Sequence, residues 1–129
     1  MPSAIQGLEA VTIHVRDVEK ARTFYRDVLE LEEVRHVPQR GATYAIPGNP
    51  TILNMHVKQP QEQGREPGTV TGLVFSVLDI TAACEGIRRA GGNITDEPEK
   101  ITNPTGTYMR ATIADPDGNE FLFRMRLPG

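Results

Sequence analysis

The sequence predicts an α+β protein made of two tandem βαβββ modules, and three observations support this fold class. Apolar and polar residues alternate in two short segments, and each segment ends at an aspartate, Asp17 or Asp79. The two aspartates lie 62 residues apart, and a segment with helical periodicity follows each of them. Extended segments follow each predicted helix, so the same order of elements occurs twice in the chain.

The first segment of each module is a predicted strand, because its apolar residues recur with the period of two that is typical of a strand with one buried face. These apolar residues are Val11, Ile13, Val15, Leu73, Phe75 and Val77. The aspartate at the end of each strand is placed to cap the next helix, since a carboxylate can accept a hydrogen bond from a free N–H group of the first turn.

Apolar residues at steps of three and four predict one helix over about residues 18–29 and another over 80–90. Gly91 and Gly92 supply a stop for the second helix. Extended segments are predicted at residues 33–38, 42–46, 51–58, 93–96, 107–114 and 120–126. The last two are joined by Asp115-Pro116-Asp117-Gly118-Asn119, whose proline and glycine specify a tight turn.

The domain organisation follows from these elements. Residues 59–68 are polar and rich in Gln, Pro and Gly, which is typical of a linker. We therefore expect a single domain over residues 1–129, with one module at about 7–58 and the other at about 69–127.

Composition excludes several classes of partner. The formal net charge is −3, so electrostatics does not favour nucleic acid or an anionic membrane. No segment approaches the roughly 18 apolar residues that a membrane span needs, and the N-terminus has no secretion signal. A single cysteine, Cys84, cannot form an internal disulfide, and we expect it to be a buried thiol. A cytoplasmic location is the expectation.

The ordered motifs resemble those of the vicinal oxygen chelate superfamily, which includes glyoxalase I, bleomycin-resistance proteins and extradiol dioxygenases. The matching segments are Val11–Asp17, Ala21–Tyr25, Leu73–Asp79 and Asp115–Asn119. The resemblance implies that the modules form a curved mixed sheet, a cup, with the helices on its outer face. It also implies a small-molecule ligand and a homodimer.

Relatives that use a metal usually hold it with His or Gln in each first strand and Glu in each fourth strand. Carried over by the resemblance, these positions are Ala10, Gly72, Leu122 and either Ile52 or Asn54. A divalent metal needs about three or four N or O ligands, so we expect the usual site to be absent and no cofactor to be needed. A displaced metal site made of His14, His56 and Glu120 stays open as an alternative.

Strand alternation assigns the side chains that line the cup. The expected ligand-binding residues are Thr12, His14, Asn54, His56, Ser76, Tyr108 and Arg124. Tyr44 is a further candidate for stacking on a planar ligand. His14 is the best acid/base candidate, and Arg124 or Arg126 could stabilise an anionic group, so His14 and Arg124 are the predicted catalytic residues.

Several functions remain open from the sequence, and whether the protein is an enzyme is not decided. The first hypothesis is a protein that binds a small organic molecule without its family's usual metal. The alternatives are a metal-dependent lyase, isomerase or ring-cleaving dioxygenase with a displaced site, a metal-free enzyme that uses His14, and an accessory domain without a ligand.

Overall fold

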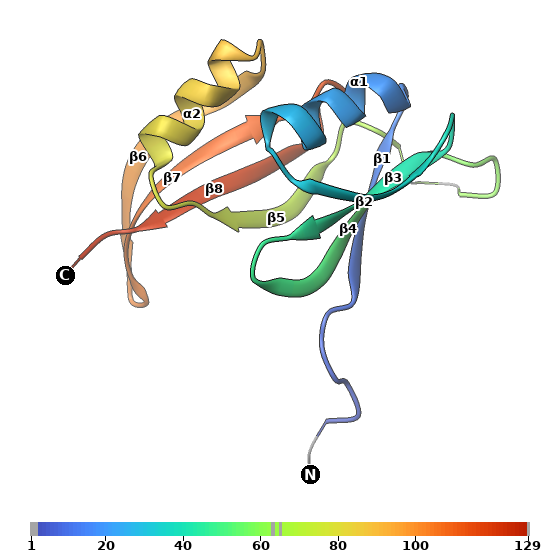
Figure 1. Cartoon of the computed structure of the whole chain (residues 1–129). Coiled ribbons are helices and arrows are strands. Elements are labelled where there is room, and N and C mark those ends of the chain that lie inside the picture. Colours follow the sequence, from blue (N-terminus) through green and yellow to red (C-terminus); the bar gives the residue numbers. More distant parts are fainter. Residues whose placement is uncertain (1–2, 63, 65, 129) are drawn as a thin grey trace. The chain divides into compact units, whose positions relative to one another are not determined.

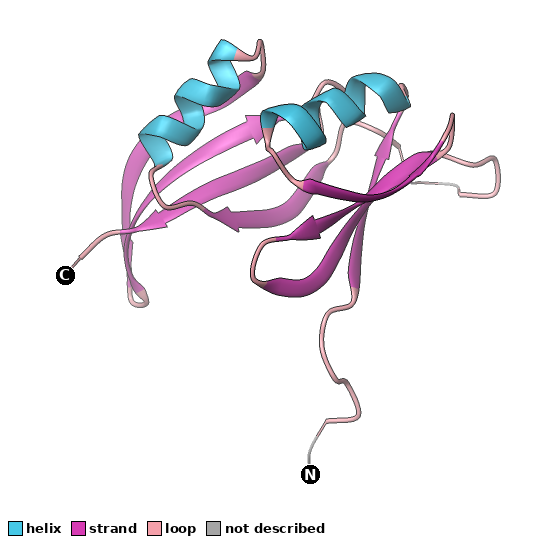
Figure 2. Cartoon of the chain, viewed as in Figure 1, coloured by secondary structure: helices cyan, strands magenta, loops and turns pink. Residues whose placement is uncertain are grey.

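The computed structural model describes residues 3–62, 64 and 66–128, and it divides into two compact units, residues 1–65 and 66–129. Each unit holds one four-stranded mixed sheet and one helical segment (Figures 1 and 2). The predicted α+β class and the repeated βαβββ order are therefore confirmed. The boundary between the units lies inside the predicted linker, and none of the described helices is long and apolar enough to cross a membrane.

The first unit has strand order β1-β4-β3-β2, in which β1 runs parallel to β4 and the other pairs are antiparallel. Its elements are β1 (Ala10–Val15), α1 (Val18–Arg22), η1 (Thr23–Val28), β2 (Glu32–Val37), β3 (Gly41–Ile46) and β4 (Asn49–Val57). As predicted, the Asp17 side chain caps α1, accepting from the N–H of Lys20 at 3.1 Å.

The first helix changes its winding partway along, which the sequence periodicity did not predict. Helix α1 continues into η1, a π-helix that ends with a 2.9 Å bond from the N–H of Leu29 to the carbonyl of Phe24. The neighbouring aromatics Phe24 and Tyr25 are both buried, and their rings meet edge to face at 5.0 Å. Tyr25 is therefore part of the core of the first unit.

An ion pair anchors this helical segment to its sheet. The Arg22 guanidinium donates from Nη2 to Glu33 Oε1 on β2 at 2.9 Å, and both side chains are mostly shielded from water. Glu33 and the exposed Glu19 together raise the pKa of Arg22, with the Glu33 hydrogen bond the larger cause. The pair fixes which side of β2 faces the helix.

The second unit repeats the arrangement with strand order β5-β8-β7-β6. Its elements are β5 (Val70–Ser76), α2 (Ile80–Arg89), β6 (Asn93–Asn103), β7 (Gly106–Ala114) and β8 (Glu120–Arg126). Asp79 caps α2 through the N–H of Ala82, as predicted. Strand β6 is much longer than the predicted 93–96, because its irregular pairing with β7 contains register shifts that hide the alternation.

The predicted hairpin turn between β7 and β8 carries a buried polar network. Asp115 accepts from the backbone N–H groups of Asp117 and Asn119, both at 2.9 Å. The Asn119 amide donates to Asp115 at 2.9 Å, and its oxygen accepts from the N–H groups of Gly68 and Thr69. Both side chains are almost fully buried, so the turn depends on this network to satisfy its polar groups.

In each unit one sheet face packs on the helix, and the core lies between them. Ile13, Val15, Leu53 and Met55 are buried in the first unit, as the alternation predicted. Phe121, Phe123 and Cys84 are buried in the second, and burial raises the pKa of the Cys84 thiol. We call the opposite surface of each sheet its helix-free face.

Tyr44 belongs to the first core rather than to a ligand surface. Its ring is fully buried, 5.9 Å from that of Tyr25, and its hydroxyl has no hydrogen-bond partner among the described residues. The suggestion that Tyr44 stacks on a planar ligand was therefore wrong. In β3 the side chain alternates to the helix side, opposite to Thr43.

Replacing Tyr44 with Phe should raise the free energy of unfolding by about 1 kcal/mol, because it removes a buried hydroxyl that lacks a partner. Burial raises the pKa of Tyr44 to about 12. In the wild type, the stability that comes from keeping the phenol neutral is fully present below the unfolded pKa of about 10 and is lost as the pH rises toward 12. The stability of Tyr44→Phe should not show this decrease between about pH 10 and 12. Urea unfolding at neutral and alkaline pH measures both effects.

Tyr108→Phe is the matched control. The Tyr108 hydroxyl contacts the Thr105 hydroxyl at 2.7 Å and accepts from Arg126 Nη2 at 3.1 Å, so the same substitution there should lower stability. A loss of stability in Tyr44→Phe equal to that of the control would show that the Tyr44 hydroxyl is satisfied in solution.

Candidate functional site

The helix-free face of the first unit is built on the parallel pair β1 and β4. Their register places Thr12 beside Asn54 and His14 beside His56. Side chains of adjacent partners in one sheet point to the same side, opposite to the buried Ile13 and its neighbours. Four of the predicted ligand-binding residues therefore share this face.

A hollow of about 450 Å³ opens over the same sheet. Its polar lining includes Arg35, Arg40, Thr43, Asn54 and His56. The Thr43 hydroxyl donates to Asn54 Oδ1 at 2.7 Å, which holds the amide in one orientation. Among the described residues, neither Arg35 nor Arg40 forms an ion pair, so the hollow carries uncompensated positive charge.

The two histidines meet in this unit and share a carboxylate that was not predicted. The imidazole rings of His14 and His56 lie edge to face, with centroids 4.7 Å apart. Glu62 Oε2 is 3.2 Å from His14 Nε2, and Glu62 Oε1 is 3.9 Å from His56 Nδ1. His56 Nδ1 also lies 3.1 Å from the carbonyl oxygen of Val57.

Glu62 is held in place by its own turn. Its N–H donates to the carbonyl of Gln59 at 2.9 Å, and its Oε1 accepts from the N–H of Gln59 at 2.8 Å. That backbone N–H and, after it, the hydrogen bond to His14 hold the pKa of Glu62 below its ordinary range. The carboxylate is therefore present as an anion near neutral pH.

Sequence reasoning missed Glu62 because it lies in the segment taken for a linker. The signal was Pro60 at the second position of a turn, followed two residues later by a carboxylate. Glu120, the carboxylate proposed from strand alternation, lies on β8 of the second unit. Its place in a site with His14 and His56 remains a prediction.

Gly41 allows β3 to approach the histidine pair closely. A Cβ atom added at Gly41 would collide with the Met55 carbonyl oxygen and with the Cβ of His56. Gly41 and His56 are register partners across β3 and β4. Because Gly41 has no side chain, the backbone of β3 can pack directly against the Cα and Cβ atoms of His56 and hold them in place.

The helix-free face of the second unit holds a different group of residues. Arg124 lies over the Tyr108 ring at 4.4 Å, and Arg126 lies over it at 4.9 Å. Cation–π contacts of this kind favour a guanidinium stacked on an aromatic face. Ser76 is the register partner of Arg124, so three predicted residues share this face. Neither arginine forms an ion pair with another described residue.

The environment of Tyr108 favours its ionised form. The hydrogen bond with Thr105 is the largest cause, and the charges of Arg126 and Arg124 add to it, so the pKa of Tyr108 is lowered. Tyr44, in contrast, has its pKa raised by burial. The two tyrosines consequently differ in how readily they lose a proton.

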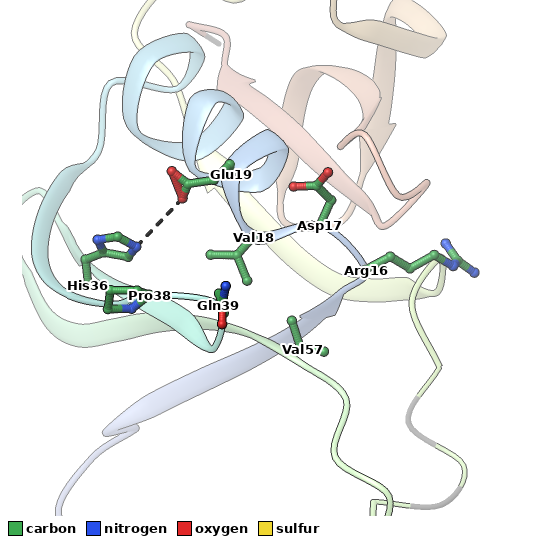
Figure 3. A pocket seen from close by; sticks show the side chains of 8 residues that line it. All are labelled: Arg16, Asp17, Val18, Glu19, His36, Pro38, Gln39 and Val57. Carbon is green, nitrogen blue, oxygen red and sulfur yellow. Dashed lines mark ion pairs between the residues drawn. The ribbon is translucent and has the colours of Figure 1, made fainter.

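A second hollow of about 400 Å³ lies where β1 meets α1 (Figure 3). Arg16, Asp17, Glu19 and His36 line it, and Glu19 Oε2 faces His36 Nε2 at 3.7 Å. None of the predicted site residues lines this hollow. Its charged groups of both signs largely compensate one another, and Asp17 already serves the helix cap.

Comparison with known proteins decides the family. A model described as the Glyoxalase/Bleomycin resistance protein/Dioxygenase superfamily matches residues 7–123. The chain belongs to this superfamily. A lactoylglutathione lyase of Haemophilus influenzae is 30% identical over 118 residues, which cover 86% of this chain and 86% of that protein.

Solved structures of this superfamily agree with the fold. A member from Sphaerobacter thermophilus is 32% identical with a TM-score of 0.79, over 95% of this chain and 98% of that one. TnmS3, an antibiotic-binding protein from Streptomyces sp. CB03234, is 26% identical with a TM-score of 0.80, over 98% of this chain and 100% of that one.

The residues at the superfamily's usual metal positions do not suit a metal. Ala10 is the register partner of Ile52, and neither side chain carries a donor atom. Leu122 on β8 has none either. Gly72 has a φ of 79°, a left-handed conformation that disfavours any residue with a side chain. Asn54 alone offers an oxygen, and Thr43 already donates to it.

Thr105→Val should raise the pKa of Tyr108, because it removes the largest contact that favours the phenolate. The ultraviolet absorbance of tyrosinate, followed as the pH is raised, should show that the tyrosine with the lowest pKa ionises at a higher pH in the variant than in the wild type. Thr102→Val is the control, since Thr102 is an exposed threonine of the same hairpin that contacts Thr107 instead. An equal shift in both variants, or none in Thr105→Val, would contradict this assignment.

Proposed function

We propose that this superfamily member binds small organic anions at arginines on the helix-free face of each sheet, without using the superfamily's usual metal positions. The observation that carries the proposal is the cationic character of these faces. Arg35 and Arg40 in the first unit, and Arg124 and Arg126 in the second, lack carboxylate partners among the described residues, while the opposite faces are apolar.

The chemistry of these side chains favours a carboxylate or a similar planar anion. A guanidinium presents a fork of N–H donors that matches the two oxygens of a carboxylate. Stacking on Tyr108 restricts the Arg124 guanidinium, so less conformational entropy is lost when it binds a ligand. The hydroxyl of Ser76 and the amide of Asn54 add neutral polar groups to their respective faces.

Relatives support a small-molecule ligand in general terms. TnmS3 is described as an antibiotic-binding protein, and several curated relatives are described as lactoylglutathione lyases.

A catalytic role for His14 and Arg124 in this chain stays a prediction. His14→Ala, assayed against any turnover found, tests it. Homodimer formation and a cytoplasmic location likewise stay predictions, and light scattering would test the first.

Arg124→Gln should weaken binding of carboxylates by about tenfold, since it removes a charge-assisted contact. We would first screen aromatic and aliphatic carboxylates, each beside its uncharged amide, such as benzoate beside benzamide, by thermal shift. Carboxylates should raise the melting temperature and the matched amides should not. Calorimetric titration of the best carboxylate would then compare the wild type with Arg124→Gln.

Arg89→Gln provides the control, because Arg89 is an exposed residue near the end of α2 and its substitution changes the net charge equally. Its affinity should match that of the wild type. Equal losses of affinity in both variants would mean that only the net charge of the protein matters, and not a contact with Arg124. Equal binding of amides and carboxylates would contradict an anionic ligand.

A further inference from the structure

We propose that His14, His56 and Glu62 form a binding site for a divalent first-row transition-metal ion in the first unit. Donor atoms of the three side chains, one from each, all lie within 4.8 Å of one another. These residues do not occupy the superfamily's usual metal positions. The metal-site proposal is also independent of the proposed anion binding, whose test uses Arg124 in the second unit.

The distances are close to those that a metal requires. Zinc binds imidazole nitrogen and carboxylate oxygen at about 2.0–2.2 Å, so neighbouring ligand atoms in its usual tetrahedral geometry lie about 3.3–3.6 Å apart. His14 Nε2 and Glu62 Oε2 are 3.2 Å apart, and a ring nitrogen of His56 completes a set of three donor atoms that all lie within 4.8 Å of one another. Small side-chain rotations would complete the geometry without moving the backbone.

The backbone already holds all three ligands. His14 and His56 are register partners on parallel strands, and the close approach of Gly41 fixes the start of the His56 side chain. Glu62 is tied to Gln59 by two hydrogen bonds, one from each residue's N–H group. Ligands placed in advance lose less conformational entropy when a metal binds.

The hydrogen bonds that the proposed ligands make to their neighbours also suit metal binding. If His56 Nδ1 carries the ring proton and donates it to the Val57 carbonyl, the lone pair on Nε2 is left for a metal. Histidines that bind metals commonly donate their other ring N–H to a carbonyl in this way.

The donor set selects the class of ion. Two imidazoles and a carboxylate suit zinc, iron, cobalt or nickel, whereas magnesium and calcium prefer oxygen ligands alone. The side chain of His56 is 34% exposed and that of Glu62 is 16% exposed. The site is therefore reachable from solvent, and water or an oxygen of a small ligand can fill the remaining coordination positions.

The test is metal retention by the full chain, prepared without a histidine tag. We would offer zinc, cobalt, nickel or iron(II) separately, dialyse, and measure bound metal by elemental analysis. About one ion per chain is expected. His14→Gln and His56→Gln should lose it, and Glu62→Gln should bind at least about tenfold more weakly, since a neutral amide replaces the charged ligand.

His36→Gln and Glu32→Gln are the matched controls, because His36 faces Glu19 and Glu32 is exposed on β2. Both should retain the metal. Circular dichroism of each metal-free variant would verify folding. Failure of the wild type to retain any of the four ions, or equal losses in the control variants, would overturn the proposal.

The visible spectrum of the cobalt form gives a second measurement that does not depend on activity. Its absorption bands should be present in the wild type and in His36→Gln, and absent in His14→Gln. Lowering the pH should also release the ion, because imidazole and carboxylate ligands must be deprotonated to bind. Binding that is unchanged on acidification would contradict ligation by histidine.

Discussion

The arrangement of side chains in both units depends on one constraint, the alternation of residues along strands that pack one face against a helix. Once Ile13 and Val15 are buried, Thr12 and His14 must lie on the other side. The same rule in β8 buries Phe121 and Phe123 and leaves Arg124 on the helix-free face. A slip of one residue would exchange apolar and functional side chains along the whole strand.

The register between paired strands determines which of these side chains become neighbours. The parallel pairing of β1 with β4 brings two histidines together, although 42 residues separate them in the chain. The antiparallel pairing of β7 with β8 sets Tyr108 opposite Arg126 and near Arg124. Each unit therefore presents a distinct set of groups, imidazoles with a carboxylate in the first and guanidiniums with a phenol in the second.

The fold could be predicted from the sequence because its signals are local. The two helix-capping aspartates and the turn at Asp115–Asn119 depend on neighbours in the chain, and the same local pattern occurs twice with an offset of 62 residues. The face shared by His14 and His56 was also predictable from alternation. Glu62 was not, because its position depends on a turn that folds a polar segment back onto a sheet. Tyr44 was suggested as a stacking residue although β3 alternates, with Ala42 and Tyr44 buried on the helix side and Thr43 on the other side.

The π-helix η1 has a consequence for how chain length can vary in this protein. A π-helical turn accommodates one more residue than an α-helical turn, so it is the place where a single insertion or deletion can be absorbed. Loss of one residue between Thr23 and Val28 would restore α-helical winding and turn Phe24 or Tyr25 away from the core. The strands on either side would keep their registers. A one-residue change of length within this helical segment should therefore be accompanied by the exchange of one of these two aromatic residues.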